Sequence, residues 1–142
     1  MSKKVSVFRK EHFNAAHKLN CLQWSDAQNE KEFGKCANPN WHGHNYDLFV
    51  TVKGEPQPET GFCIDLKYLS DIIEERVTDK LDHKNLNIDV DFMQGKMASC
   101  EVLVMEFWKI LAPAVKEITP RGSLYKLTLY ETPRNFVEYV GE

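Results

Sequence analysis

Residues 42–52 read HGHNYDLFVTV, and this stretch decides the predicted fold. β-Branched and aromatic residues dominate positions 46–52, a composition that favours a strand, and turn-forming Gly and Pro residues follow. Side chains two positions apart on a strand point to the same face. His42 and His44 therefore continue the apolar row that begins at Tyr46, and the two imidazoles are expected to share one side of the strand.

Outward from this strand, the sequence predicts elements in the order strands, helix, helix, strands. Asp65 is a good N-cap for a helix to about Leu81, and Ser99 is a good N-cap for a second helix that Pro113 should kink or end. The other expected elements are a strand over 5–19 with room for a bulge, a long functional loop over 20–35, a short returning strand at 61–64, and strands over 124–131 and 136–140 joined by a turn at 132–135. This order predicts the α+β class, with both helices on one face of an antiparallel sheet.

Composition limits the classes of function. The chain has 142 residues, 18 Lys and Arg against 21 Asp and Glu, a net charge of −3 and 42% hydrophobic residues, which predicts a single domain over 1–142. With no basic cluster and no apolar run of about 20 residues, we expect neither nucleic acid nor membrane as a partner. The N-terminal charges precede no apolar stretch, so we expect a cytoplasmic protein. The four cysteines form no C-x-x-C pair, which argues against a disulfide framework.

Three histidines predict a metal site. His17 ends the first predicted strand, and His42 with His44 opens the next one, so three imidazoles can meet across neighbouring strands. Three nitrogen ligands leave one position of tetrahedral zinc open, which is the pattern of catalytic sites. Each histidine taken alone is more often an ordinary core or surface residue, and we keep that interpretation for His12. The residues alone suit copper, nickel or iron as well as Zn²⁺.

Cys36 is a candidate acid–base or nucleophilic residue. It lies six positions before His42, and both the neighbouring Lys35 and a nearby metal would favour its thiolate. It could also be a fourth metal ligand, which would close the site. The remaining alternative is a small buried hydrophobic residue, the interpretation that we give to Cys21 and Cys63.

Two acidic positions complete the candidates. Glu131 ends a row with Tyr125, Leu127 and Leu129, and a buried carboxylate there would need a bidentate partner such as a planar heterocycle with two parallel N–H groups. The alternative is a strand-end charge that reaches solvent. In the Asp82-His83 pair, the carboxylate can orient the imidazole for proton transfer, unless the imidazole pairs with Cys36 instead. The alternative for this pair is a polar helix end.

These pieces, in this order, resemble the 6-pyruvoyl-tetrahydropterin synthase family over nearly the whole chain. The resemblance rests on four blocks: Phe13 to Leu19, Phe33 to Tyr46, Leu81 to Leu86 and Leu129 to Thr132. It implies a tunnelling fold, or T-fold, with a four-stranded antiparallel sheet and two helices. It also implies a homohexamer, a dimer of trimers, with sites between subunits.

The resemblance also implies roles for individual residues. It implies Zn²⁺ on His17, His42 and His44, proton abstraction by Cys36, a relay through Asp82 and His83, a pterin anchor at Glu131 and a second pterin-contacting stretch at Ser99, Cys100 and Glu101. The implied substrate is 7,8-dihydroneopterin triphosphate. The implied reaction removes triphosphate, rearranges the side chain by internal redox chemistry and gives 6-pyruvoyl-tetrahydropterin without an external redox cofactor.

Two departures and three alternatives accompany this resemblance. The family usually has Thr-Thr-Glu-Asn where this chain has Ser-Cys-Glu-Val at 99–102, and Trp41 takes a position often given to a small residue. The first alternative is 6-carboxytetrahydropterin synthase of queuosine biosynthesis, against which the five residues between Cys36 and His42 argue. The others are a non-catalytic pterin-binding protein, which would need no acid or base, and a zinc-dependent hydrolase acting on another substrate.

Overall fold

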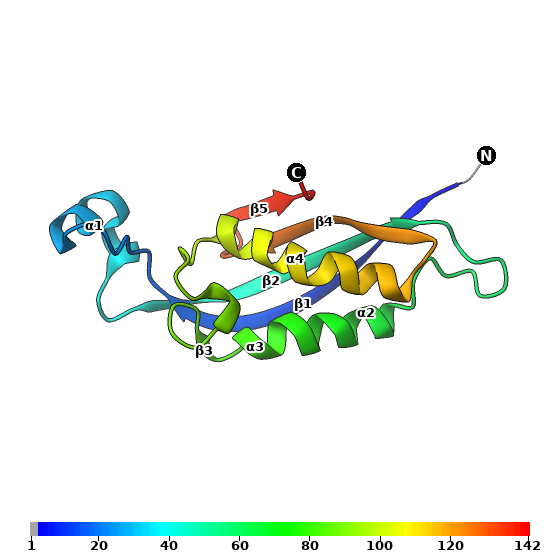
Figure 1. Cartoon of the computed structure of the whole chain (residues 1–142), viewed down its shortest axis with the longest axis horizontal. Coiled ribbons are helices and arrows are strands. Elements are labelled where there is room, and N and C mark those ends of the chain that lie inside the picture. The colour runs from blue at the N-terminus through cyan, green and yellow to red at the C-terminus, as the bar shows by residue number, and fades with distance from the viewer. Residues whose placement is uncertain (1–2) are drawn as a thin grey trace.

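The computed structural model describes residues 3–142 and places one mixed five-stranded sheet beneath two longer helical segments (Figure 1). Met1 and Ser2, which the predicted domain includes, lie outside the described residues. The strands are β1 Val5–His17, β2 His42–Gly54, β3 Lys84–Asn85, β4 Gly122–Tyr130 and β5 Phe136–Tyr139. The helices are α1 Asp26–Phe33, α2 Leu66–Ile73, α3 Asp79–Leu81 and α4 Cys100–Ile118, with a π-helical segment Glu74–Thr78 between α2 and α3 and short 3-10 helices at Gly34–Ala37 and Asp91–Met93.

The α+β class and the T-fold are confirmed, but the sheet has one strand more than the four predicted. The strand order is β3-β1-β2-β4-β5, and β3 pairs parallel to β1 whereas the other pairs are antiparallel. The two residues of β3 carry no alternating pattern that could signal a strand. Long-range bonds hold it instead, because the N–H of His83 donates to the carbonyl of Asn14 at 2.6 Å and that of Leu86 donates to Ala16 at 2.8 Å.

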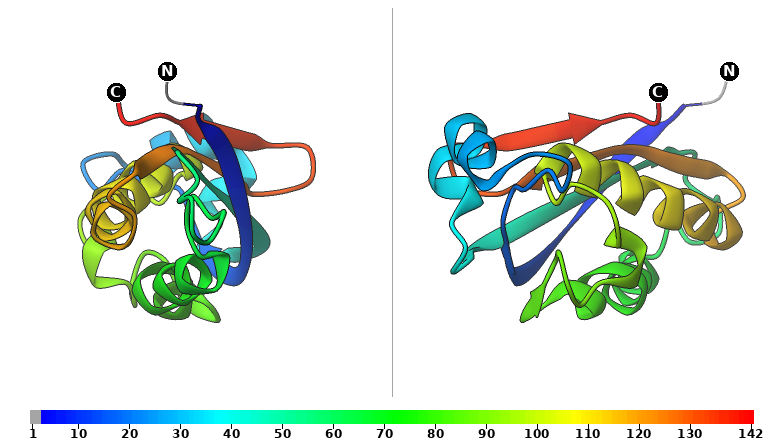
Figure 2. Two further views of the ribbon diagram at one scale, coloured as in Figure 1. Left: turned by 90° about the vertical axis from the view of Figure 1, so that its right-hand side faces the viewer. Right: turned by 60° about the vertical axis from the view of Figure 1, so that its left-hand side comes forward.

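Both longer helices cover the same face of the sheet, as predicted (Figure 2). α2 contacts β1, and α4 contacts β4 and β5. The hydrophobic core lies between these layers, so alternate residues of β1 are buried, among them Phe13, Ala15 and His17. The opposite face of the sheet is more open, and there Phe8 is 59% exposed. Within residues 3–142, no helix combines the length and apolar character that a membrane crossing needs.

The pairing of β1 with β2 positions the candidate metal ligands. The ladder runs without a register shift from Val5 opposite Gly54 to His17 opposite His42. β1 therefore ends at His17, two residues before the predicted end and without the bulge. β2 begins at His42, so His44 lies inside the strand and shares the face of Tyr46, as the alternating pattern indicates.

The predicted loop over 20–35 is wrong, because α1 occupies most of it. Ser25 caps this helix by accepting a hydrogen bond from the N–H of Gln28. Only Asn29 is buried, and its side chain bonds to the backbone N–H and carbonyl of Cys21. α1 is thus held by polar contacts and has no apolar stripe, which is the signal from which a helix is recognised in a sequence.

Two further expectations about regular structure are corrected. Residues 61–64 form no strand, because the N–H of Gln57 bonds to the carbonyl of Phe62 and the N–H of Gly61 bonds to the carbonyl of Gln57, which makes a turn. The Asp65 and Ser99 caps are confirmed, each accepting a hydrogen bond from the first turn of its helix. Pro113 lies inside α4 without ending it, since the helix continues to Ile118.

A β-bulge changes the face of Tyr125. Thr51 pairs with Lys126 and Val52 with Leu124, so Tyr125 is an extra residue in β4. A bulge moves the residues on its two sides out of simple alternation. Leu124 is buried and Tyr125 is 46% exposed, so Tyr125 does not share the face of Leu127 as predicted.

The closest approach of two strands suggests a stability test. A Cβ atom on Gly54 would lie 2.6 Å from the Cα atom of Gly122 and 2.8 Å from the sulfur of Cys63. Gly54→Ala should therefore push β2 and β4 apart and lower the free energy of unfolding by about 2 kcal/mol. Urea denaturation measures this change, with the exposed Ser123→Ala as the control. A Gly54→Ala protein as stable as the Ser123→Ala control would contradict the close packing.

Candidate metal centre and adjoining cavity

The structure brings His17, His42 and His44 together. His17 is the last residue of β1 and lies opposite His42, the first residue of β2. One ligand atom from each of the three side chains lies within 4.8 Å of the other two. The ring centroids are 4.6 Å apart for His17 and His42 and 4.9 Å apart for His42 and His44. Three imidazoles at these separations can bind one divalent ion.

The ring nitrogens at the centre of this cluster have no other partner. Nε2 of His17, Nδ1 of His42 and Nε2 of His44 are buried and accept or donate no hydrogen bond among the described residues. An unpaired buried polar atom costs free energy, and a bound cation would remove that cost. Nδ1 of His17 lies 2.7 Å from the carbonyl oxygen of Ala98. Its proton therefore sits on Nδ1, and the lone pair of Nε2 points at the cluster.

Electrostatics favour the metal-binding form of the imidazoles. Burial lowers the pKa of His17 and of His44 from the ordinary value, and the neighbouring His42 lowers both further. The carboxylate of Glu131 opposes these shifts without reversing them. Since a neutral imidazole is the form that binds a metal, the donor set fits a divalent cation such as Zn²⁺.

Glu131 lies directly after β4 and next to this cluster. Its carboxylate oxygens are 3.8 Å from Nε2 of His17 and 3.7 Å from Nε2 of His44. The thiol of Cys100 donates to its Oε2 atom at 3.7 Å. Burial, and secondarily the charge of Glu131, raises the pKa of the Cys100 thiol far above its ordinary value, so Cys100 remains a neutral donor.

A cavity of about 440 Å³ opens beside Glu131. Its volume lies in the usual range of small-molecule sites. Its lining joins the loop after β1, the start of α4 and the turn before β5: Leu19, Ser99, Cys100, Glu101, Glu131, Arg134, Asn135, Phe136 and Val137. The three residues predicted from the 99–101 stretch thus share one cavity with Glu131.

Sequence reasoning missed two contributors to this site. Ala98 acts through its backbone carbonyl, for which no side-chain pattern exists, and the next residue, Ser99, accepts a hydrogen bond from the N–H of Val102 that starts α4. Arg134 brings a cation to the cavity. A charged residue in a predicted turn near Glu131 was its only available signal.

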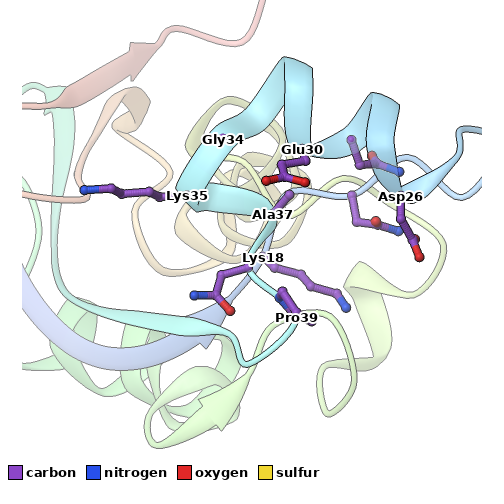
Figure 3. A pocket seen from close by; sticks show the side chains of 10 residues that line it. Lys18, Asp26, Glu30, Gly34, Lys35, Ala37 and Pro39 are labelled. Atoms are coloured by element: carbon purple, nitrogen blue, oxygen red, sulfur yellow. The ribbon is translucent and has the colours of Figure 1, made fainter.

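Cys36 lies at the edge of the same end of the sheet. It belongs to the 3-10 helix Gly34–Ala37 and is half-buried, and its carbonyl accepts a hydrogen bond from the N–H of Leu19 at 2.7 Å. This bond fixes the Cys36 backbone beside the segment that follows His17. Figure 3 shows the neighbouring cavity of about 680 Å³, in which the side chains of Lys18 and Lys35 extend in different directions. Of the other cysteines, Cys63 is buried as expected, whereas Cys21 is only half-buried.

Asp82 and His83 pair with each other. Oδ2 of Asp82 lies 2.9 Å from Nδ1 of His83, and Oδ1 accepts the N–H of Asn14 at 2.8 Å. That backbone bond is the main reason why the pKa of Asp82 lies below its ordinary value. The side chain of His83 is 82% exposed. Within residues 3–142, the hydrogen bonds and ion pairs of these two side chains include neither Cys36 nor the three clustered histidines.

Metal analysis tests the three-histidine centre. The purified protein is expected to bind one divalent ion per chain, and His42→Ala should lose it because two imidazoles hold such an ion poorly. The ion should raise the unfolding temperature of the wild-type chain, because a ligand that binds only the folded state stabilises it. His12→Ala is the control, since that side chain is 56% exposed on β1. An equal metal content in His42→Ala would contradict the site.

Comparison with known proteins agrees with this geometry. The family model described as 6-pyruvoyl tetrahydropterin synthase matches residues 6–142. Proteins named 6-pyruvoyl tetrahydrobiopterin synthase are 43% identical in Pongo abelii and 42% in Homo sapiens, each over 138 residues that cover 97% of this chain and 92% of the relative. The solved structure of Caenorhabditis elegans 6-pyruvoyl tetrahydropterin synthase superposes with a TM-score of 0.88 at 36% identity, covering 99% of this chain and 98% of that one. The chain belongs to the 6-pyruvoyl tetrahydropterin synthase family.

Proposed function

We propose that residues 1–142 form a single zinc-dependent pterin synthase domain that converts 7,8-dihydroneopterin triphosphate into 6-pyruvoyl-tetrahydropterin with loss of triphosphate. The observation that carries this proposal is the set of three unpaired, buried imidazole nitrogens beside the cavity that contains Glu131. The names of the relatives support the same reaction. Cytoplasmic location stays a prediction from the sequence.

The histidines would hold the zinc ion and leave one position for the substrate. When bound, the ion supplies a Lewis acid that stabilises negative charge developing on the oxygens of the substrate side chain. His17 contributes Nε2 because the carbonyl of Ala98 holds the proton on its other nitrogen. The chain thus orients this imidazole before any substrate arrives.

Glu131 would anchor the pterin ring. A carboxylate can accept two parallel N–H bonds from the 2-amino group and the ring nitrogen of a pterin. The thiol of Cys100 already donates to one of its oxygens, and Ser99 and Glu101 line the same cavity. Because Glu131 lies within 4 Å of His17 and His44, a pterin held there would direct its side chain toward the histidines.

Cys36 would move the protons of the side-chain rearrangement. Its thiolate takes a proton from a carbon next to an oxygen of the substrate, and the electron pair left behind forms the enol-like intermediate. The Asp82 carboxylate holds the His83 imidazole at 2.9 Å, an arrangement that fixes its tautomer for proton exchange. These two roles divide the chemistry between a base and a proton relay.

The separation of the pair from Cys36 supports an assembly in which sites lie between chains. His83 is largely exposed, and its side chain bonds only to Asp82 among the described residues. The open sheet face carries exposed apolar side chains, including Phe8 and Phe136, which a neighbouring subunit could cover. We therefore propose a homohexamer of two trimers, in which Asp82 and His83 of one chain serve the cavity of another.

Product analysis tests the reaction. With 7,8-dihydroneopterin triphosphate, the protein should release triphosphate and form 6-pyruvoyl-tetrahydropterin. Cys36→Ala should lower kcat by about a hundredfold or more because it removes the base, while Cys21→Ala, half-buried on the same segment, should not. Acetaldehyde and a carboxylated pterin would instead identify a 6-carboxytetrahydropterin synthase. A product with an unchanged side-chain oxidation state would identify a hydrolase.

Subunit complementation tests the shared site. Cys36→Ala and His83→Ala should each be inactive, and subunits exchanged between the two should regain activity, because mixed hexamers contain sites with both residues intact. Light scattering checks that six chains assemble. Mixed hexamers without activity, or a monomer in solution, would contradict the proposed arrangement.

A further inference from the structure

Trp41 has a backbone conformation that its side chain disfavours. Its φ angle is +68°, and among residues 3–142 only His83 is another non-glycine residue with positive φ. In this left-handed region, a Cβ atom approaches the following carbonyl, so glycine adopts it freely and bulky residues rarely do. Such a conformation persists only where the surrounding structure imposes it, and it often marks a functional position.

Hydrogen bonds on both sides of Trp41 impose this conformation. The N–H of Trp41 donates to the carbonyl of Asn38 at 3.0 Å, which closes a turn over 38–41. The side chain of Asn38 tightens that turn by accepting the N–H of Asn40 at 2.8 Å. On the other side, His42 is already paired with His17 in the ladder. Glycine at position 41 would satisfy the same bonds without strain, so the indole ring must have a use of its own.

The indole ring contacts Lys18. The ammonium nitrogen of Lys18 lies 4.3 Å from the ring centroid, well within the range of a cation–π interaction. The Lys18 backbone is fixed by Asn87, whose side-chain oxygen accepts its N–H at 3.1 Å and whose amide donates to its carbonyl at 3.1 Å. Lys18 follows His17 and Trp41 precedes His42, so the contact joins the residues just outside the last pair of the ladder.

We propose that the contact between Lys18 and Trp41 is a brace that positions His17 and His42 for the metal ion. The two histidines are the terminal pair of β1 and β2, and beyond them no ladder bonds hold the strands together. Strand ends open more readily than strand centres. The brace closes this end and keeps the two imidazole centroids 4.6 Å apart. Lys18 and Trp41 are thus positioning residues that act through the ligands.

Zinc affinity of the substrate-free protein tests the brace. Competition with a chromophoric chelator should show zinc binding about ten-fold weaker in Trp41→Gly and in Lys18→Met, a typical loss when groups that support metal ligands are removed. The matched control is Lys53→Met, because Lys53 makes a similar contact with the Tyr125 ring, at 4.8 Å, away from the histidines. This control should bind zinc like the wild type.

Thermal unfolding of the metal-free proteins separates a positioning role from a merely structural one. Trp41→Gly should unfold at the wild-type temperature or above it, since glycine removes the backbone strain. Trp41→Phe keeps an aromatic face and should recover most of the zinc affinity. The double variant Trp41→Gly, Lys18→Met should bind zinc no more weakly than either single variant, because each change breaks the same contact.

Several outcomes would overturn the brace. These are unchanged zinc affinity in Trp41→Gly and Lys18→Met, an equal loss in Lys53→Met, or losses that add fully in the double variant. The inference rests on the proposed metal site and not on the proposed reaction, because no substrate is present in these measurements. A wild-type protein that binds zinc tightly yet forms another product would refute the proposed reaction and leave the brace standing.

Discussion

The antiparallel ladder between β1 and β2 is the constraint on which the rest of the structure depends. It holds the two strands in one register from Val5 to His17. Side chains alternate between the faces, so a slip by one residue would turn His17 away from His42 and expose the apolar row of the core. The same register that buries Phe13 against Tyr46 therefore also assembles the histidine cluster. Fold stability and metal-site geometry share one set of bonds.

The start of α4 connects this ladder to the cavity. In three consecutive residues, the Ala98 carbonyl orients His17, the Ser99 hydroxyl caps the helix and the Cys100 thiol contacts Glu131. The helix packs on β4 and β5, which bring Glu131 and the turn before β5 to the same place. A shift of α4 along the sheet would thus disturb the ligand orientation and the cavity lining together.

The parts of the fold that sequence reasoning predicted have strong local signals. Alternation indicated β2, and good caps with apolar stripes indicated the helices that begin after Asp65 and Ser99. The errors fall where long-range or polar contacts decide. α1 is held by the side chain of Asn29, β3 exists only by pairing with β1, and the bulge at Tyr125 depends on how β4 meets β2.

The sequence by itself determined which residues carry the chemistry: histidines in strand alternation, a cysteine before them and a carboxylate at the end of an apolar row. Residue identity and parity are local properties, and both can be read along one chain. Only the tertiary structure decided that the Ala98 carbonyl fixes a tautomer, that Asp82 pairs with His83 and that Lys18 covers the ring of Trp41. These contacts depend on backbone groups and on the geometry of turns, and such features leave no pattern of side chains in the sequence.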